Sequence, residues 1–505
     1  MPLPSDTTPC PQVTPLPCRT PRRGGRRRLA LVTICLAQLM VVVDGTIVNV
    51  ALPSLTADLM ISTADRQWVV TAYMLAFGGL LLLGGRFADR FGRKRMLMVG
   101  LTGFAFASAL GGAADSLEAL LAARAGQGAF GALLAPTALS LLSTAFPDPG
   151  DRRRAFGIYG AVAGGGSALG LLLGGVLTQH LTWRWCMLIN VPVAALALLC
   201  AAPLPREHRV KGGRPRVDIP GAILVTGGLV TIVYGFTRAE GDGWGAAGTL
   251  ALLGTGVALL LLFVLIEKRV PSPLLPLRTI MHSTRAGANL SVLLAVAGMF
   301  AVFFFLNFYL QDVKAWSPMV TGAAFLPMTG AVLIASLLAG SRLPTRVPPR
   351  VVISLSALIA AIGMVLLSRL DVTSGYGHVL AALIAIGFGM GGVLTSAIDT
   401  ATHGVDPRDA GVAGATVNAA FQVGGSLGTA LLNTIAASAT SDYLSTRVSS
   451  PARRIDALVH GYGVASWWGA GILAAAGLVA LFLINVAGPA TTRQAARVDT
   501  ESHHA

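Results

Sequence analysis

Two charged residues stand deep inside apolar stretches of the sequence, and their chemistry is the most specific that the chain offers. Asp44 lies within such a stretch and has no charged neighbour close in sequence. An ionised, unpaired carboxylate at that depth in a bilayer costs several kcal/mol, and intramembrane acids mark ion paths and proton relays. Asp44 is therefore a candidate to bind and release a proton. The alternative is a structural carboxylate that is paired to another helix.

Arg124 is the one basic residue deep inside an apolar stretch. At a rise of 1.5 Å per helical residue, Arg124 lies roughly 10 Å from the end of its stretch and Asp44 roughly 12 Å from the end of its own, on the same side of the membrane. The two side chains can therefore pair or compete. We interpret both as proton-coupling residues, and a static packing pair is the alternative.

The elements that must position these residues are membrane-spanning helices. Of the 505 residues, 54% are hydrophobic and 12% are charged, whereas a soluble protein is about 25% charged. This composition excludes a soluble enzyme, a disordered protein and a disulfide scaffold. Since a bilayer core needs about 20 apolar residues per helix, we predict an all-α integral membrane protein with fourteen transmembrane helices: 29–52, 68–84, 96–114, 117–142, 155–178, 186–203, 218–237, 247–266, 286–310, 320–340, 350–368, 378–400, 409–437 and 461–487.

The net charge of +15 has a topological explanation. If residues 1–28 are cytoplasmic, the cytoplasmic segments hold 29 Lys and Arg residues and the outside loops hold 8. This asymmetry follows the positive-inside rule. It predicts that both termini lie in the cytoplasm. Membrane topology, and not nucleic-acid binding, therefore explains the basic composition. The N-tail 1–28, rich in Pro, Thr and Arg, is expected to be disordered.

Weak internal similarity divides the chain into two halves. Gly-rich and Arg-containing patterns recur in the same order, offset by about 260 residues, as in Gly126-Gln127-Gly128 against Gly387-Phe388-Gly389. We predict two pseudo-repeated six-helix halves, an architecture typical of transporters, and two additional linking helices. The predicted units are the N-tail, the halves 29–203 and 286–487, a basic linker 204–285 that holds the two linking helices, and a cytoplasmic C-tail 488–505.

A basic segment follows the second predicted span. Its glycines permit a tight turn, and its basic cluster suits the anionic cytoplasmic leaflet. Asp89 stands alone among these cations and could accept hydrogen bonds at a helix N-terminus. A plain positive-inside loop explains the arginines but leaves Asp89 unexplained. The predicted gating residues are Gly85, Asp89, Arg90, Gly92, Lys94 and Arg95.

Two glycine patterns match the dinucleotide fingerprint, at 126–131 and 387–392. That fingerprint needs a strand before it and a helix after it, whereas small residues within apolar helices serve close helix packing. The five cysteines form no CxxC pair and indicate neither a metal site nor a disulfide framework. We therefore expect no cofactor, no metal and no enzymatic activity.

Polar residues on the spans are weaker candidates for a substrate cavity. Asn418 and Gln422 are one turn apart and face the same way, and helix–helix hydrogen bonding is as good an explanation. Asn307 lies in an aromatic cluster that is more typical of an interfacial belt. The predicted cavity residues are Thr46, Asn49, Gln127, Asn307, Asn418 and Gln422.

These motifs resemble those of the major facilitator superfamily. Residues 85–95 are similar to its G-x-x-x-D-R-x-G-x-K-R loop. Residues 44–53 are similar to the D-x-T-I-V-N-V-A-L-P signature of the fourteen-helix drug:proton antiporter branch, and 124–128 to its R-x-x-Q-G motif. Residues 183–192 resemble its W-R-W…N-V-P stretch. The resemblance covers the whole span layout and is specific through residues 44–192.

The resemblance implies a substrate cavity between two halves that works by alternating access. In such a protein Asp89 would latch the inward-closed state, and Asp44 with Arg124 would serve proton coupling. One position departs from the branch, because Leu171 stands where the span-five motif G-x-x-x-G-P-x-x-G-G has its proline. Any kink at that point is lost or left to the glycines, which weakens the inference of antiport over uptake.

The combined interpretation is a monomeric protein of a bacterial inner membrane that exports lipophilic small molecules in exchange for protons. A proton-coupled importer has the same fold and stays an alternative. A membrane sensor or an intramembrane enzyme is a third hypothesis. The sensor lacks an output domain, and the enzyme lacks catalytic groups beyond Asp44 and Arg124.

Overall fold

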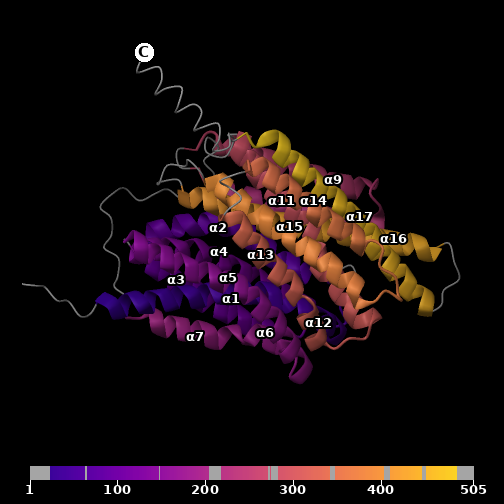
Figure 1. Cartoon of the computed structure of the whole chain (residues 1–505), viewed down its shortest axis with the longest axis horizontal. Coiled ribbons are helices and arrows are strands. Elements are labelled where there is room, and N and C mark those ends of the chain that lie inside the picture. Colours follow the sequence, from indigo (N-terminus) through magenta and orange to yellow (C-terminus); the bar gives the residue numbers. More distant parts are fainter. Residues whose placement is uncertain are drawn as a thin grey trace, which may run out of the picture.

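The structure, a computed structural model, describes residues 23–62, 65–146, 148–203, 218–270, 273–274, 283–341, 347–402, 410–445 and 451–485. Over these ranges the regular structure is helical (Figure 1). The first group of helices is α1 (Arg23–Asp58), α2 (Trp68–Phe91), α3 (Arg93–Gly112), α4 (Leu117–Ala145), α5 (Pro149–His180), α6 (Arg184–Leu188) and α7 (Asn190–Ala201). Two further helices follow, α8 (Ile219–Asp242) and α9 (Ala247–Glu267).

The remaining helices form the second group. They are α11 (Ser283–Phe308), which continues into the π-helical turn η1 (Tyr309–Val313), then α12 (Pro318–Ala324), α13 (Leu326–Ser341), α14 (Pro349–Leu367), α15 (Tyr376–Thr402), α16 (Ala410–Ser445) and α17 (Pro451–Leu483). Each of the fourteen predicted spans coincides with one helix or with two consecutive ones, so the predicted fold class is confirmed.

Thirteen of these segments, within the described residues, are long and apolar enough to cross a membrane. The exception among the fourteen is α16, which is long enough but carries Asn418, Gln422 and Asn433 among many small residues. A helix of this composition fits a position where protein, and not lipid, covers it. Its neighbours α2, α8, α11 and α17 supply that cover.

Two predicted spans are interrupted where the prediction had them continuous. The span predicted at 186–203 consists of α6 and α7, and the span at 320–340 consists of α12 and α13. Proline explains both breaks, because its ring clashes with the carbonyl four residues earlier and it donates no hydrogen bond. Pro192 disrupts the turn at which α6 ends, and Pro327 does the same after α12.

The last two helices extend beyond the spans predicted at 409–437 and 461–487. Helix α16 runs to Ser445 and α17 begins at Pro451, so both helices project beyond the apolar runs that predicted them. The tails at 1–22 and 486–505 lie outside the described residues, and so does the basic segment 204–217.

Helix contacts follow the same order in the two groups. In the first, α4 packs against α2 and α3, α1 against α5, and α3 against α7. In the second, α15 packs against α13 and α14, α11 against α16, and α14 against α17. This is the pairing that the sequence similarity predicts, and we call the two groups the N-half and the C-half. In Figure 1 they form the purple and the orange-to-yellow bundles.

The linking helix α8 packs along the seam between the halves. It contacts α2 of the N-half and α16 of the C-half, while α9 packs against α8. Buried Leu229 and Val233 of α8 join Leu75 and Ala430 in one apolar cluster. Gln67 also donates a hydrogen bond to Thr237 over 3.1 Å. The linking helix α8 therefore contacts both halves.

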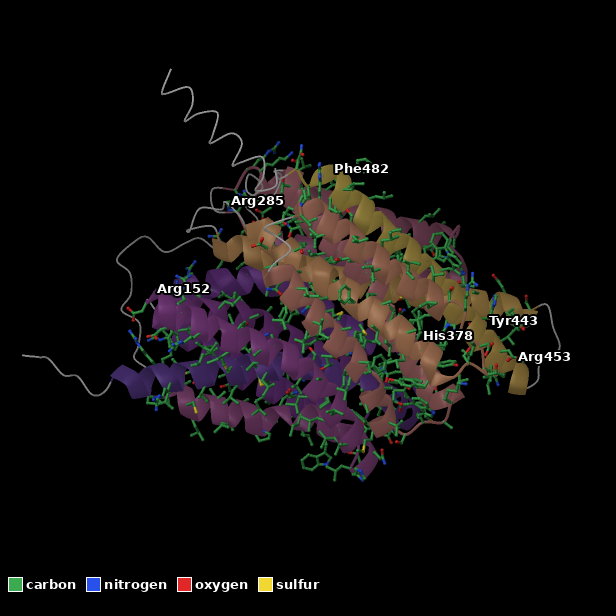
Figure 2. All side chains as sticks on the ribbon, in the orientation of Figure 1. Arg152, Arg285, His378, Tyr443, Arg453 and Phe482 are labelled. Carbon is green, nitrogen blue, oxygen red and sulfur yellow. The ribbon has the colours of Figure 1, made fainter. Side chains whose placement is uncertain are left out.

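The halves pack against each other along α2 and α16 and, at one end of the molecule, also through α5 and α12. Arg152 and Arg285 mark one end and Tyr443 and Arg453 the other (Figure 2). We call these the inner and outer ends, because the charge count assigns the first to the cytoplasm.

Near the outer end, Gln311 of the C-half donates a hydrogen bond to the carbonyl oxygen of Val50 over 3.0 Å. Gly322 lies so close to α5 that a Cβ there would overlap the carbonyl oxygen of Leu171. Met319 similarly abuts Gly175. These contacts hold the halves together at the outer end in this conformation.

Candidate functional site

Asp44 and Arg124 form an ion pair in the interior of the N-half. The Arg124 Nη1 atom lies 2.8 Å from Asp44 Oδ2. The side chain of Asp44 is 0% exposed and that of Arg124 is 1% exposed. The predicted proximity of these two residues is thus confirmed, and their role in proton coupling stays a prediction.

Two amides complete the surroundings of the carboxylate. Gln127 Nε2 and Asn190 Nδ2 donate to Asp44 Oδ1 over 2.9 and 2.8 Å. Asp44 therefore accepts three hydrogen bonds from α4 and α7, two neutral and one charge-assisted. Each group of a buried polar network must be satisfied for it to be stable, and this network meets that condition around the carboxylate.

The guanidinium of Arg124 is held independently of Asp44. Its Nε atom donates to the carbonyl oxygen of Val69 on α2 over 3.0 Å, and Nη1 also donates to Gln127 Oε1 over 2.9 Å. The ring of Tyr73 lies 4.5 Å from the guanidinium carbon, in the range of a cation–π contact. Loss of the Asp44 charge would thus leave Arg124 anchored to Val69 of α2 and to Gln127.

Sequence reasoning missed two members of this network. The sequence marks Asn190 only as part of the W-R-W…N-V-P motif and does not mark Ser108. Ser108 accepts a hydrogen bond from Gln127 Nε2 over 2.8 Å. Both are polar residues with little surface exposure, 1% for Asn190 and 0% for Ser108. A polar side chain in an apolar span could have suggested them, but many other residues share that signal.

The predicted cavity residues of the N-half are engaged within the protein. Thr46 donates to the carbonyl oxygen of Val42, and Asn49 to that of Gly45, each over 3.0 Å within α1. Gln127 is 0% exposed and belongs to the Asp44 network. In this conformation each of the three donates a hydrogen bond within the protein, and their place in a substrate cavity stays a prediction.

The C-half candidates divide into two kinds. Asn307 is 0% exposed, donates to the carbonyl oxygen of Phe303 over 2.7 Å and accepts from Gln311 over 3.4 Å. Asn418 is exposed and Gln422 half-buried on α16, and no hydrogen bond is found for either within the described residues. Asn418 and Gln422 are therefore the predicted cavity residues that remain available to a substrate.

The predicted turn after the second span is shorter than expected. Helix α2 continues through Phe91, so Gly85 and Arg90 are helical and the reversal is confined to Gly92. Its φ of +95° is a conformation that favours glycine. Lys94 donates to the carbonyl oxygen of Ala202 over 2.8 Å, which ties this corner to the end of α7. Arg95 is exposed.

The side chain of Asp89 lies outside the described residues, so its latch role stays a prediction. We expect Asp89→Asn to weaken the contact between the halves at the inner end by about 0.3–1 kcal/mol, the usual worth of an acid at a helix N-terminus. The variant should then spend more time open to the inside. The measurement is the labelling rate of a single cysteine placed at Asn418, with Asp242→Asn at the end of α8 as control. Unchanged labelling and unchanged transport would leave Asp89 as an ordinary loop residue.

The glycine patterns act in helix packing, as predicted. A Cβ at Gly128 would overlap the carbonyl oxygen of Tyr73, and one at Gly131 would lie 2.8 Å from the Phe77 ring. In the C-half, Gly389 is similarly close to the carbonyl oxygen of Ser356. These glycines let α4 approach α2, and α15 approach α14, at backbone distance.

Comparison with known proteins gives the family. The family model described as Major Facilitator Superfamily matches residues 34–429, and the chain belongs to this family. It is 51% identical over 463 residues to the puromycin resistance protein of Streptomyces alboniger, across 91% of this chain and 92% of that protein. It is 42% identical over 415 residues to the cephamycin export protein of Amycolatopsis lactamdurans, across 82% of this chain and 85% of that one.

Solved structures agree on the fold. A bacterial homolog of the human lysosomal transporter Spinster, in an inward-facing and unoccupied conformation, aligns with a TM-score of 0.65 at 16% identity, over 91% of this chain and 97% of that one. At this identity the likeness concerns the fold alone. The chain is thus a multi-pass membrane protein of the major facilitator superfamily, as its motifs indicate.

Proposed function

We propose that this protein is a proton-coupled exporter of lipophilic small molecules that works by alternating access. The observation that carries the proposal is the buried Asp44–Arg124 pair, with its amide partners, in a chain 51% identical to a puromycin resistance protein. Relatives named for cephamycin export and lincomycin resistance support export over uptake. Import of an organic solute is the alternative.

The energy would come from protons entering the cell. Each charge that crosses 100 mV supplies about 2.3 kcal/mol. Proton uptake at Asp44 would remove one charge from the ion pair and weaken the attraction between α1 and α4. Since Asp44 is fully buried while the outer end is closed, we infer that proton exchange occurs in another conformation. Proton uptake and the conformation described here would then be separate steps of the transport cycle, and coupling requires such a separation.

The remaining parts of the proposal concern location and composition. Both termini would lie in the cytoplasm of a bacterium and the protein would sit in the inner membrane, in agreement with the Lys and Arg count. It would act as a monomer, with no cofactor, no metal and no catalytic activity.

Everted membrane vesicles test the direction of transport. Vesicles that carry the protein should accumulate labelled puromycin, lincomycin or another lipophilic antibiotic when a proton gradient is formed, and release it when an uncoupler collapses the gradient. Vesicles from the same host without the protein are the control. Gradient-driven loss of solute from the vesicles would favour the importer.

Substrate charge gives a further prediction. A lipophilic dication needs two compensating carboxylates, because an unpaired buried charge is very costly. Asp44 is already satisfied, and α11, α12, α13 and α14 contain no Asp or Glu.

We therefore expect several-fold resistance to neutral, anionic or singly charged lipophilic compounds and no measurable resistance to bis-cationic biguanides or diamidines. The measurement is the minimum inhibitory concentration in a host without its own exporters. Strong resistance to the bis-cations would overturn this charge argument.

A further inference from the structure

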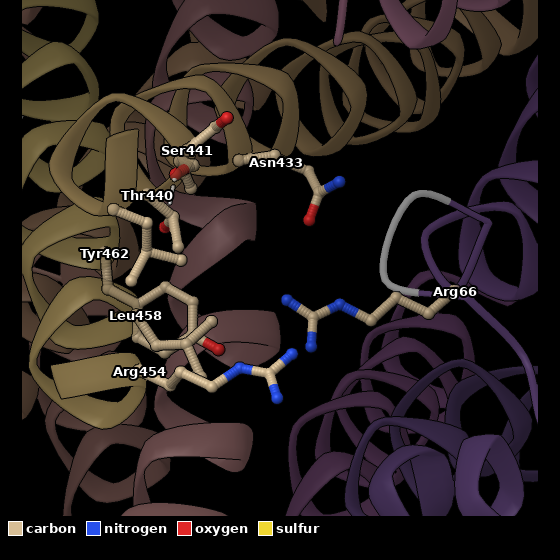
Figure 3. A pocket seen from close by; sticks show the side chains of 10 residues that line it. Arg66, Asn433, Thr440, Ser441, Arg454, Leu458 and Tyr462 are labelled. Atoms are coloured by element: carbon tan, nitrogen blue, oxygen red, sulfur yellow. Dashed lines mark hydrogen bonds between the residues drawn. The ribbon is translucent and has the colours of Figure 1, made fainter. Parts of the chain in front are cut away.

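A second polar site lies at the outer end, between the halves and away from the Asp44 network. It is a cavity of about 350 Å³, within the usual range of small-molecule sites. Arg66, from the loop between α1 and α2, forms one side, and α16 and α17 form the other (Figure 3). The lining residues are Arg66, Asn433, Ala436, Ala437, Thr440, Ser441, Leu444, Arg454, Leu458 and Tyr462.

The polar atoms of this cavity are suited to an anion. Arg66 and Arg454 extend into the same space from opposite sides, and the amide of Asn433 points toward it (Figure 3). The ten lining residues include two cations and no carboxylate. In the part of the chain that the structure describes, no ion pair within 4 Å joins either arginine to an acid. The nearby acid Asp312 acts on Arg66 at longer range and does not line the cavity.

Two buried groups in the cavity wall lack the partners that they need. Arg66 is 7% exposed and Asn433 is 1% exposed. The Nε atom of Arg66 and the Nδ2 atom of Asn433 are buried with no hydrogen-bond partner in the described structure. A buried donor without an acceptor costs about 1–3 kcal/mol, so both donors would be stabilised by a ligand that brings acceptor oxygens.

The position of Arg66 is set by its aromatic neighbours. Its guanidinium carbon lies 4.8 Å from the centre of the Phe304 ring and 4.0 Å from that of Phe308. These contacts hold the charge in place without neutralising it. The apolar part of the wall, with Leu444 and Leu458, offers room for a hydrocarbon group.

We propose that this outer cavity binds an organic anion, a small amphiphile with one carboxylate, sulfonate or phosphate group, between Arg66 and Arg454. Arg66 belongs to the N-half and Arg454 to the C-half, so the bound anion bridges the halves where they already meet. Binding from the outside therefore stabilises the conformation that is closed at the outer end. The site is independent of the proposed proton-coupled export, and its test needs no transport.

Equilibrium dialysis of the full-length protein tests the proposal, with labelled 4-phenylbutyrate as the probe and nanodiscs of phosphatidylcholine as the membrane. We expect saturable binding of one phenylbutyrate per protein. The matched amide, 4-phenylbutyramide, should bind about tenfold more weakly or worse, since hydrogen bonds to charged groups are the stronger ones. Equal binding of the acid and the amide would overturn the proposal.

Three variants locate the binding. Arg454→Gln, at an exposed position, should weaken phenylbutyrate binding about tenfold, and Arg454→Lys should retain most of it. Arg453→Gln removes the neighbouring exposed charge, which does not line the cavity, and should leave binding unchanged. Equal loss in Arg453→Gln and Arg454→Gln would mean that a diffuse surface charge attracts the probe, and would refute the site.

Competition identifies the source of the anion. Nanodiscs in which part of the lipid is phosphatidylglycerol should weaken phenylbutyrate binding if a lipid phosphate enters the cavity, and leave it unchanged if the ligand comes from water. Both outcomes agree with the proposed chemistry. If phosphatidylglycerol weakens binding to the wild-type protein, it should have no such effect on Arg454→Gln. If inorganic sulfate at equal concentration displaced all of the bound phenylbutyrate, the proposal of an amphiphilic ligand would be wrong. The cavity would then be a general anion site.

Discussion

Asp44→Asn should abolish proton-driven transport while folded protein remains in the membrane. The amide cannot change its charge between the pH values of the two sides, so the ion pair with Arg124 can no longer respond to the proton gradient. Gradient-driven uptake of a substrate by everted vesicles should fall to the level without a gradient, a loss of about 100-fold if the effect matches that of other essential proton-transfer groups. Asp44→Glu keeps a titratable group and should retain part of the activity.

The matched control is Asp242→Asn, which removes an acid that is 45% exposed and paired to Arg238 within one helix. Exposed pairs of this kind contribute about 0.3–0.5 kcal/mol, so transport should be unchanged. The amount of each variant in the membrane is compared by quantitative immunoblot. Wild-type rates in Asp44→Asn under a proton gradient would show that Asp44 is structural.

The pairing of Asp44 and Arg124 could be predicted because both facts behind it are local. Each residue is a lone charge in an apolar run, and a helix converts sequence distance into depth at a fixed rise. Depth alone does not say which helices adjoin. Asn190 of α7 completes the network around the carboxylate, although it lies 146 positions along the chain from Asp44. This contact depends on which helices are neighbours, and the sequence does not show that.

Helix ends and breaks were predicted less well, for two physical reasons. An apolar run marks the part of a helix that lies in lipid, so it missed the turns of α16 and α17 that project beyond the apolar stretch. Proline is tolerated in membrane helices when neighbours satisfy the freed backbone groups, so Pro53 lies inside the continuous helix α1 while Pro192 follows a break. The sequence around a proline does not decide between these outcomes.

The outer cavity could not be inferred from sequence. Arg66 and Arg454 belong to the eight Lys and Arg residues of the predicted outside loops, in segments far apart along the chain. Their convergence depends on the closure of the two halves at the outer end, which tight contacts such as that of Gly322 with Leu171 produce. Leu171 itself, the departure from the antiporter motif, lies in a continuous α5 and is 1% exposed. Its backbone carbonyl is the group that Gly322 approaches.

Arg124→Gln should destabilise the protein strongly, and Asp44→Asn should largely restore its stability without restoring transport. In the single variant the carboxylate of Asp44 stays buried with two neutral donors, and removing one partner of a buried ion pair costs about 3–5 kcal/mol. In the double variant neither charge is present, so that penalty disappears. Thermal unfolding of the purified proteins, followed by intrinsic fluorescence, measures the recovery.

This pair of variants separates packing from coupling. If the ion pair served packing alone, the double variant would regain transport together with stability. If it couples protons to export, the double variant is stable and cannot use a proton gradient, and vesicle uptake should stay at the level without a gradient. Destabilisation of the double variant by the full sum of the single effects would mean that Asp44 and Arg124 act independently, against the 2.8 Å contact between them.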